Sequence, residues 1–180
     1  MSELIPGLEV FLQDPPGWAD KAPLGLLCHP PSVDRSFRPA PELVTQRFPG
    51  QLQVLFSPQH GLKGEKQDNM VSSPDFEDPL LHISVISLYG PRLDPPLEAF
   101  GKIDVLLVDL QDVGTRVYTY IWTLSYCLEA CGERGIPVVV LDRPNPLGGV
   151  RVEGPRLKPS YASFIGRAPI PMRHGLTIGE

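Results

Sequence analysis

Five short apolar runs, bounded by proline, glycine or polar residues, predict the strands of a sheet. Four are almost continuously apolar, as in parallel strands covered on both faces, whereas Ile83–Leu88 partly alternates and is expected nearer an edge. The starts of the runs lie 28, 31, 20 and 35 residues apart, close to the roughly 30 residues of a β-α-β unit. The pattern predicts an α/β fold with an open, mostly parallel sheet flanked by helices. The runs span residues 24–28, 52–56, 83–88, 103–110 and 138–141.

The connections between these runs differ in helical character. Residues 118–133 have apolar positions at helical spacing and glycines before Pro137, so they predict the longest helix. Residues 41–48 predict a two-turn helix with proline at its first position, and residues 96–100 predict barely one turn. The polar stretch 63–78 shows no period and is expected to be a long loop.

The chain changes character after Leu141, where Pro, Gly and Arg become frequent and no strand pattern occurs before Met172. Thr177 and Glu180 have the spacing of a capping box, in which two side chains bond each other's backbone N–H groups at a helix start. We expect residues 1–23 to be a lead-in and residues 24–180 to form one domain with long Pro/Gly-rich loops, which the family resemblance given below implies is Rossmann-like and of catalytic type. A helix start at the last residue predicts that a C-terminal domain of the same protein is missing from this chain.

Composition and charge narrow the class of partner. The 180 residues are 42% hydrophobic, and no run approaches the roughly 18 apolar residues of a membrane span. The formal net charge of −5 disfavours nucleic acid and anionic membranes, which attract clustered Lys and Arg. Three cysteines without a C-x-x-C pair argue against a disulfide framework or zinc ribbon. The N-terminus has no secretory pattern, so we expect a cytoplasmic chain or one that begins after a removed signal, which leaves export of the parent open.

Ligands of open parallel sheets bind outside the carboxyl ends of the strands, and four of the five predicted ends carry ionisable groups or amides. The first predicted strand is followed by Cys-His-Pro-Pro in place of G-x-G-x-x-G, and the sequence contains neither a P-loop nor G-x-S-x-G. These absences disfavour dinucleotide, nucleotide and serine-hydrolase chemistry. The histidines lack metal-ligand spacing, so we expect no metal and no cofactor.

Once these classes are set aside, carboxylate chemistry remains. Glycosidic cleavage is a reaction of this kind, because it commonly uses two carboxyl groups. Asp112 is the favoured acid because Gly114 lets backbone approach a ligand, although a structural role is equally compatible. His60 lies between Pro58 and Gly61, a position that favours a site role over a core role. Tyr118 fits either the helix core or a ring that stacks on a sugar. The other loop acids are Asp142, Glu153, Glu180 and the more distant Glu65.

Basic residues at these strand ends have two interpretations. Arg116 and Arg143 could hold a carboxylate with two parallel hydrogen bonds. Asp142 and Arg143 could equally form an ion pair that orders their loop, and Asp109 is more typical of a structural acid.

Six motifs in fixed order resemble the domain-of-unknown-function 1343 family, represented by NamZ-type exo-β-N-acetylmuramidases. The resemblance implies a Rossmann-like N-terminal domain that holds the active site, followed by a smaller C-terminal domain that this chain would lack. It also implies a glycoside hydrolase that removes terminal N-acetylmuramic acid from peptidoglycan-derived sugars, so the expected partner is a small-molecule or oligosaccharide substrate. The motifs cover residues 57–64, 87–90, 103–120, 141–149, 152–155 and 174–180.

One position departs from the family pattern. Members with muramidase activity resemble Pro-Glu-His-Gly in the loop after the second strand, with that glutamate the expected acid, whereas this chain has Gln59. An amide cannot donate a proton as a carboxylic acid does. Either Glu65 replaces it, or the protein acts on another substrate, or it is a non-catalytic sugar- or anion-binding module. The candidate catalytic residues are Gln59, His60, Glu65, Asp112 and Glu180, and the candidate substrate-binding residues are Arg116, Tyr118, Asp142, Arg143, Asn145, Glu153 and His174.

Overall fold

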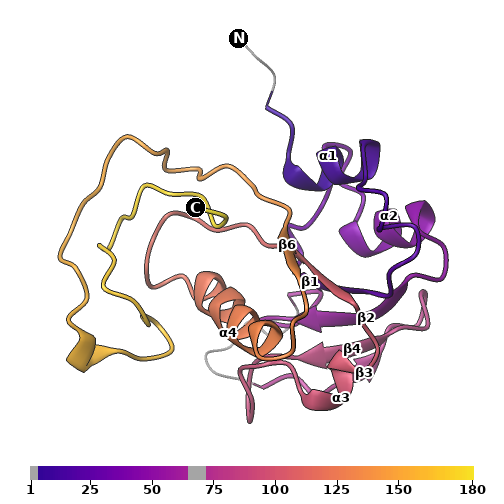
Figure 1. Ribbon diagram of the computed structural model, residues 1–180. Coiled ribbons are helices and arrows are strands. Elements are labelled where there is room, and N and C mark those ends of the chain that lie inside the picture. Colours follow the sequence, from indigo (N-terminus) through magenta and orange to yellow (C-terminus); the bar gives the residue numbers. More distant parts are fainter. Residues whose placement is uncertain (1–3, 65–71) are drawn as a thin grey trace.

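A computed structural model describes residues 4–64 and 72–180, which form a six-stranded sheet between two pairs of helices (Figure 1). The strands are β1 (Leu24–Cys28), β2 (Leu52–Ser57), β3 (Phe76–Glu77), β4 (Ser84–Ser87), β5 (Val105–Asp109) and β6 (Val138–Val140). The helices are α1 (Gly7–Gln13), α2 (Ala40–Arg47), α3 (Leu97–Phe100) and α4 (Tyr120–Gly132), with a 3₁₀ turn at Pro159–Tyr161.

The sheet has the order β3-β4-β2-β1-β5-β6, and only β3 runs antiparallel to its neighbour. Numbered among themselves, the five parallel strands therefore follow the order 3-2-1-4-5, the Rossmann order without its sixth strand, and the strand order reverses between β1 and β5. The predicted Rossmann-like sheet is confirmed. The partly alternating strand β4 lies next to the edge, covered on its outer side by two-residue β3.

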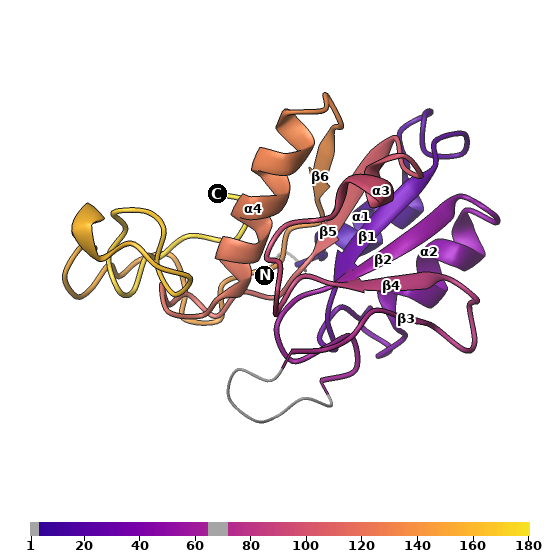
Figure 2. The ribbon, with the colours of Figure 1, turned by 90° about the horizontal axis from the view of Figure 1, so that it is seen from below.

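Each face of the sheet is covered by one pair of helices (Figure 2). Successive residues of β1 point to opposite faces, so Leu26 joins the core beneath α1 and α2 whereas Leu27 joins the core beneath α3 and α4. Both leucines are fully buried, as are most residues of the central strands. Burial on both faces explains the continuously apolar runs in the sequence.

One α-helix and one β-strand were not predicted from the sequence. Helix α1 lies in the expected lead-in, where its Leu8 is fully buried and the Gly7 N–H donates to the Asp142 carbonyl at 2.8 Å. A Cβ at Gly7 would lie 2.4 Å from the Asp142 backbone nitrogen, so only glycine fits this contact. Strand β3 lies in the stretch expected to be a loop, of which residues 65–71 are outside the described residues.

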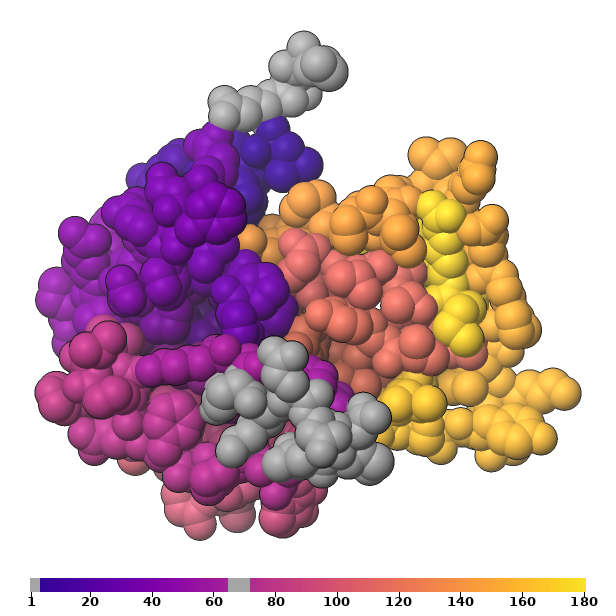
Figure 3. Space-filling model, turned by 180° about the vertical axis from the view of Figure 1, so that it is seen from behind, coloured from indigo at the N-terminus to yellow at the C-terminus, as the bar shows by residue number. Residues whose placement is uncertain are grey.

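Residues 144–176, named here the C-terminal arm, leave the body after β6 and return beside it (Figures 1 and 2). The two sides of the arm pair at Glu153 and Arg173, whose backbones exchange two hydrogen bonds. The base of the arm is closed by Asn145, whose Nδ2 donates to the Leu176 carbonyl at 2.9 Å. Figure 3 shows the arm on one flank of the molecule, beside the segment that follows β5.

The capping-box spacing of Thr177 and Glu180 is confirmed. The Thr177 N–H donates to Glu180 Oε2 at 2.8 Å, and the Glu180 N–H lies 3.3 Å from Thr177 Oγ1. Within residues 4–64 and 72–180, no helix has both the length and the apolar character needed to cross a membrane.

Candidate active site

A cleft of about 240 Å³ opens at the carboxyl ends of β1 and β2, beside the start of α4. Strand β1 borders the switch point of the sheet, which is where ligands of open α/β sheets bind. The cleft combines aromatic rings, prolines and imidazoles, a lining that suits a polar ligand with apolar faces. Its lining residues are His29, Pro30, Pro31, His60, Gly64, Tyr118 and Tyr120.

The loop after β2 brings two predicted residues to this cleft. His60 and Gly61 have φ values of 76° and 78°, the left-handed region that a non-glycine residue seldom adopts. Gln59 is held against the start of α4, because the Thr119 hydroxyl donates to Gln59 Oε1 at 2.9 Å. The Gln59 side chain therefore has a defined orientation next to the His60 turn.

Two tyrosines form the side of the cleft contributed by the start of α4. The Tyr118 and Tyr120 rings meet edge to face with centroids 4.8 Å apart. Burial raises the pKa of both phenols, and the Asp112 carboxylate adds to the effect at Tyr118. Both side chains therefore stay neutral at physiological pH and can donate or accept hydrogen bonds.

Behind Tyr118, Asp112 and His174 form a buried pair. His174 Nε2 lies 3.1 Å from Asp112 Oδ2, which also accepts the Gly114 N–H at 2.8 Å. The Leu176 N–H donates to His174 Nδ1 at 3.3 Å, so the neutral imidazole carries its proton on Nε2. Burial raises the pKa of Asp112, and the Gly114 N–H and His174 oppose this rise.

Arg143 pairs with Asp109, whereas the sequence suggested an ion pair with its neighbour Asp142. Arg143 Nε and Nη2 contact the two Asp109 carboxylate oxygens at 2.5 and 2.9 Å, and Nη2 also donates to the Val33 carbonyl. Asp109 is fully buried and Arg143 is 8% exposed. The guanidinium thus joins β5 to the loop after β6 and is already occupied by a carboxylate.

Asp142 holds the returning chain. Its two carboxylate oxygens accept the Thr177 hydroxyl at 2.6 Å and the backbone N–H groups of Arg143 and Gly179 at 3.0 Å. A carboxylate with three such donors is typical of a structural anchor.

The other predicted residues support the arm. Arg116 is buried and its Nη1 donates to the carbonyls of Pro155 and Ile170 at 2.9 and 2.7 Å. Glu153 forms an exposed ion pair with Arg173. Of the predicted residues that the structure describes, only His60 and Tyr118 line the cleft, and Gln59 and Asp112 lie directly behind its lining. Glu65 is outside the described residues, and Arg116, Asp142, Arg143, Asn145, Glu153, His174 and Glu180 belong to the surrounding framework.

His29 lines the cleft but was not among the predicted site residues. It directly follows β1 and is 3% exposed, and its Nδ1 lies 3.0 Å from Ser32 Oγ. Burial lowers the pKa of His29 to about 3, and the positive charge of Arg143 adds to this shift, while backbone carbonyls of Asp109 and Gln111 oppose it. The position of His29 immediately after a buried strand was the available sequence signal.

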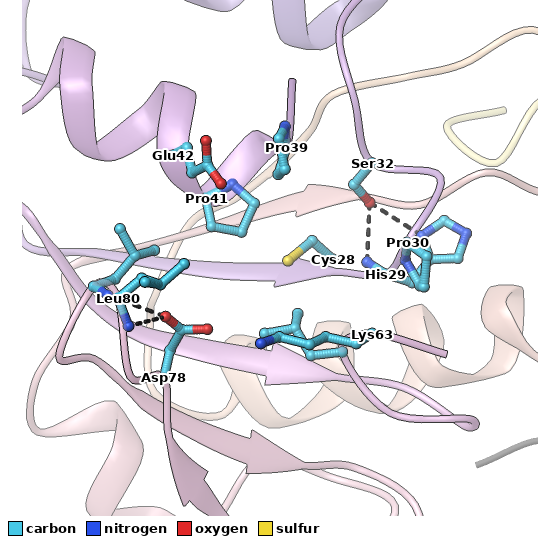
Figure 4. Close-up of a pocket in the computed structure, with 12 residues that line it drawn as sticks. Cys28, His29, Pro30, Ser32, Pro39, Pro41, Glu42, Lys63, Asp78 and Leu80 are labelled. Atoms are coloured by element: carbon cyan, nitrogen blue, oxygen red, sulfur yellow. Dashed lines mark hydrogen bonds between the residues drawn. The ribbon is translucent and has the colours of Figure 1, made fainter. Parts of the chain in front are cut away.

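A second cavity of about 220 Å³ lies on the other side of His29 and Pro30 (Figure 4). Its walls are mostly apolar, with the charged residues Glu42, Lys63 and Asp78 among them. Within the described parts of the chain, no group of three or more His, Cys, Asp or Glu side chains could hold a metal ion.

The low pKa of His29 predicts acid sensitivity. In the unfolded chain His29 binds a proton near the ordinary histidine pKa of 6.5, whereas in the folded chain its imidazole stays neutral down to about pH 3. The unfolded state therefore binds more protons between these values, and stability falls as pH is lowered, by about 2 kcal/mol at pH 5. Urea unfolding between pH 7 and 5 should show a smaller loss for His29→Gln than for the parent.

The control for this experiment is His82→Asn, which removes a histidine whose side chain is 78% exposed. This variant should keep the pH dependence of the parent. An equal pH dependence in His29→Gln and the parent would contradict the prediction.

The fold and the cleft define an open-sheet α/β domain with a cleft beside the switch point of its sheet. The chain belongs to the family described as exo-beta-N-acetylmuramidase NamZ, N-terminal, whose model matches residues 24–180. It is 43% identical over 175 residues to the peptidoglycan beta-N-acetylmuramidase NamZ of Bacillus subtilis (strain 168), covering 97% of this chain and 42% of that protein.

Two solved structures of DUF1343 family proteins from Bacteroides fragilis NCTC 9343 are also similar. One matches with a TM-score of 0.87 at 33% identity, over 97% of this chain and 44% of the other. The second has a TM-score of 0.81 at 31% identity, over 99% of this chain and 45% of the other. The chain thus spans less than half the length of each of these relatives.

Proposed function

We propose that this chain forms the active-site domain of a glycoside hydrolase that removes terminal N-acetylmuramic acid from peptidoglycan-derived sugars. The observation that carries the proposal is the cleft itself, which gathers the Gln59-His60 turn and Tyr118 at the switch point of a sheet of this family. The B. subtilis relative is named for such an activity. The tyrosine rings offer faces on which a sugar can stack.

The acid of this reaction must be a protonated carboxyl group. Gln59 cannot supply it, whereas burial raises the pKa of Asp112, whose charge acts on Tyr118 of the cleft lining. Its Oδ1 is buried and has no hydrogen-bond partner among the residues that the structure describes, so this oxygen is not used there. Asp112 and Glu65 are therefore the two acids that we propose for proton donation, with His60 as the polar group at the cleft surface.

A non-catalytic sugar-binding module is the second candidate, and the Gln59 geometry favours it. The amide oxygen accepts the Thr119 hydroxyl at 2.9 Å, so the side chain is ordered as an amide and can bind sugar hydroxyls without transferring a proton.

Incubation of the full-length protein with a chromogenic N-acetylmuramide distinguishes the two candidates. Release of the chromophore supports the hydrolase, and binding of N-acetylmuramic acid without turnover supports the module. Absence of both would contradict the proposed function.

We also propose that the C-terminal arm contacts a further domain of the longer protein. Val150 and Val152 on the arm are 96% and 61% exposed, and Tyr161 at its tip is 71% exposed. Exposed apolar patches commonly mark association surfaces. The 180-residue chain alone should therefore self-associate or unfold at a lower temperature than the full-length protein. A sedimentation profile of a clean monomer with equal thermal stability would contradict this prediction.

A further inference from the structure

We propose that His29 is a substrate-binding residue whose Nε2 accepts a hydrogen bond from a hydroxyl group of the sugar bound in the cleft. This inference rests on the proposed function and extends it to a residue outside the family motifs recognised in the sequence. Three features of the structure support it: the fixed tautomer of the ring, the missing partner of Nε2, and the place of the ring between two cavities.

The tautomer follows from the hydrogen bonds of Ser32. The Ser32 hydroxyl lies 2.5 Å from the Asp109 carbonyl, which can only accept, so the single hydroxyl proton is used there. Ser32 Oγ must then accept from both of its other contacts, the His29 backbone N–H and His29 Nδ1, each at 3.0 Å. Nδ1 therefore carries the ring proton, and Nε2 presents a lone pair.

The lone pair on Nε2 is not used by any of the described residues. Nε2 is buried and has no hydrogen-bond partner among the described residues. An unpaired buried polar atom costs free energy, and a site that supplies its partner on ligand binding removes this cost. The neutral ring keeps the lone pair available because burial and Arg143 hold the pKa of His29 far below neutrality.

The surroundings of the ring indicate the direction from which a partner comes. His29 packs edge to face on Tyr120 with centroids 4.6 Å apart, and both residues line the cleft with His60 and Tyr118. Figure 4 shows the imidazole extending away from Glu42 and Leu80, which lie across the apolar cavity. The ring thus belongs to the wall shared by the two cavities, with the tyrosine-lined cleft on its Tyr120 side.

The first test uses the parent protein, so that no variant needs to fold. In full-length protein with ¹⁵N-labelled histidines, long-range ¹H–¹⁵N spectra should show His29 with the proton on Nδ1. Titration with N-acetylmuramic acid should shift the His29 Nε2 resonance, while the exposed His82 stays unchanged. A proton on Nε2 in the free protein, or a titration that shifts His60 but not His29, would overturn the inference and leave the proposed function standing. A titration that shifts none of the cleft resonances would overturn both.

The second test compares two amides at the same position. Glutamine places its amide near the Nε2 position, whereas asparagine places its amide near Nδ1 and so keeps only the Ser32 contact. Loss of one neutral hydrogen bond corresponds to roughly a two- to tenfold change in affinity. We expect His29→Asn to raise the Kd for N-acetylmuramic acid by about this factor, and His29→Gln to bind close to the parent. Equal affinity of His29→Asn and the parent, with thermal unfolding confirming that both are folded, would show a structural role only and overturn the inference.

Discussion

If the loop after β2 holds the catalytic position and neither Asp112 nor Glu65 already supplies the proton, Gln59→Glu in the full-length protein should raise the hydrolysis of a chromogenic N-acetylmuramide by about 10²–10⁴-fold, the usual contribution of general acid catalysis. The substitution changes one amide nitrogen to oxygen, and the Thr119 hydroxyl that now donates to Gln59 Oε1 at 2.9 Å could donate equally to a carboxylate. The new acid would therefore take the present orientation of the amide beside the His60 turn. Initial rates against the parent measure the effect.

Two further variants make the result specific. Gln46→Glu adds the same charge at an exposed position on α2 and should leave the rate unchanged. If Glu65 already acts as the acid, Glu65→Gln abolishes activity and Gln59→Glu changes little, because a second nearby carboxylate adds repulsion without a new role. If both Gln59→Glu and Glu65→Gln match the parent, the chemistry does not use this loop.

Arg143→Met should lower the free energy of unfolding by about 3–5 kcal/mol, because it leaves the fully buried Asp109 carboxylate without its partner. A domain is stabilised by only about 5–15 kcal/mol in total, so the loss is a large share. Urea unfolding monitored by circular dichroism measures it. The substitution should also disturb the cleft, because the Asp109 carbonyl accepts the Ser32 hydroxyl and Ser32 Oγ in turn contacts His29 Nδ1.

The matched control breaks an exposed ion pair. Asp20 and Arg47 lie 3.1 Å apart with 57% and 40% of their side chains exposed, so Asp20→Asn should cost less than about 1 kcal/mol. The double variant Asp109→Leu, Arg143→Met should recover most of the lost stability, because an apolar pair leaves no unpaired charge. A loss for Arg143→Met no larger than that for Asp20→Asn would contradict the structural role assigned to the buried pair.

The sheet was predictable because β1, β2 and β5 are buried on both faces and therefore consist of nearly continuous runs of apolar residues. Helix α4 was predictable because its 13 residues are enough to show apolar positions at helical spacing. Helix α1 has only seven residues, too few for a period, and it forms where Gly7 and Leu8 pack on the end of β6. Strand β3 consists of two residues whose pairing with β4 depends on tertiary contact.

Only those parts of the site that follow a predicted strand or belong to a sequence motif were predictable. The position of His60 between Pro58 and Gly61 favoured a site role over a core role, and in the structure His60 lines the cleft in a turn with positive φ. The partner of Arg143 was not visible, because Asp109 lies 34 residues away in sequence while Asp142 is adjacent. The pairing of Asp112 with His174 likewise joins residues on different loops, and no local pattern records such a contact.

The closed base of the C-terminal arm has an evolutionary consequence. Because Asn145 and Leu176 tie the two ends of the arm together and Arg116 holds Pro155 and Ile170, changes in length at residues 158–162 need not displace β6 or the returning chain. Doubling the length of a closed loop costs only about 0.6 kcal/mol in closure entropy. The tip of the arm is therefore free to diverge in length and sequence while the cleft at the carboxyl ends of β1 and β2 keeps its geometry.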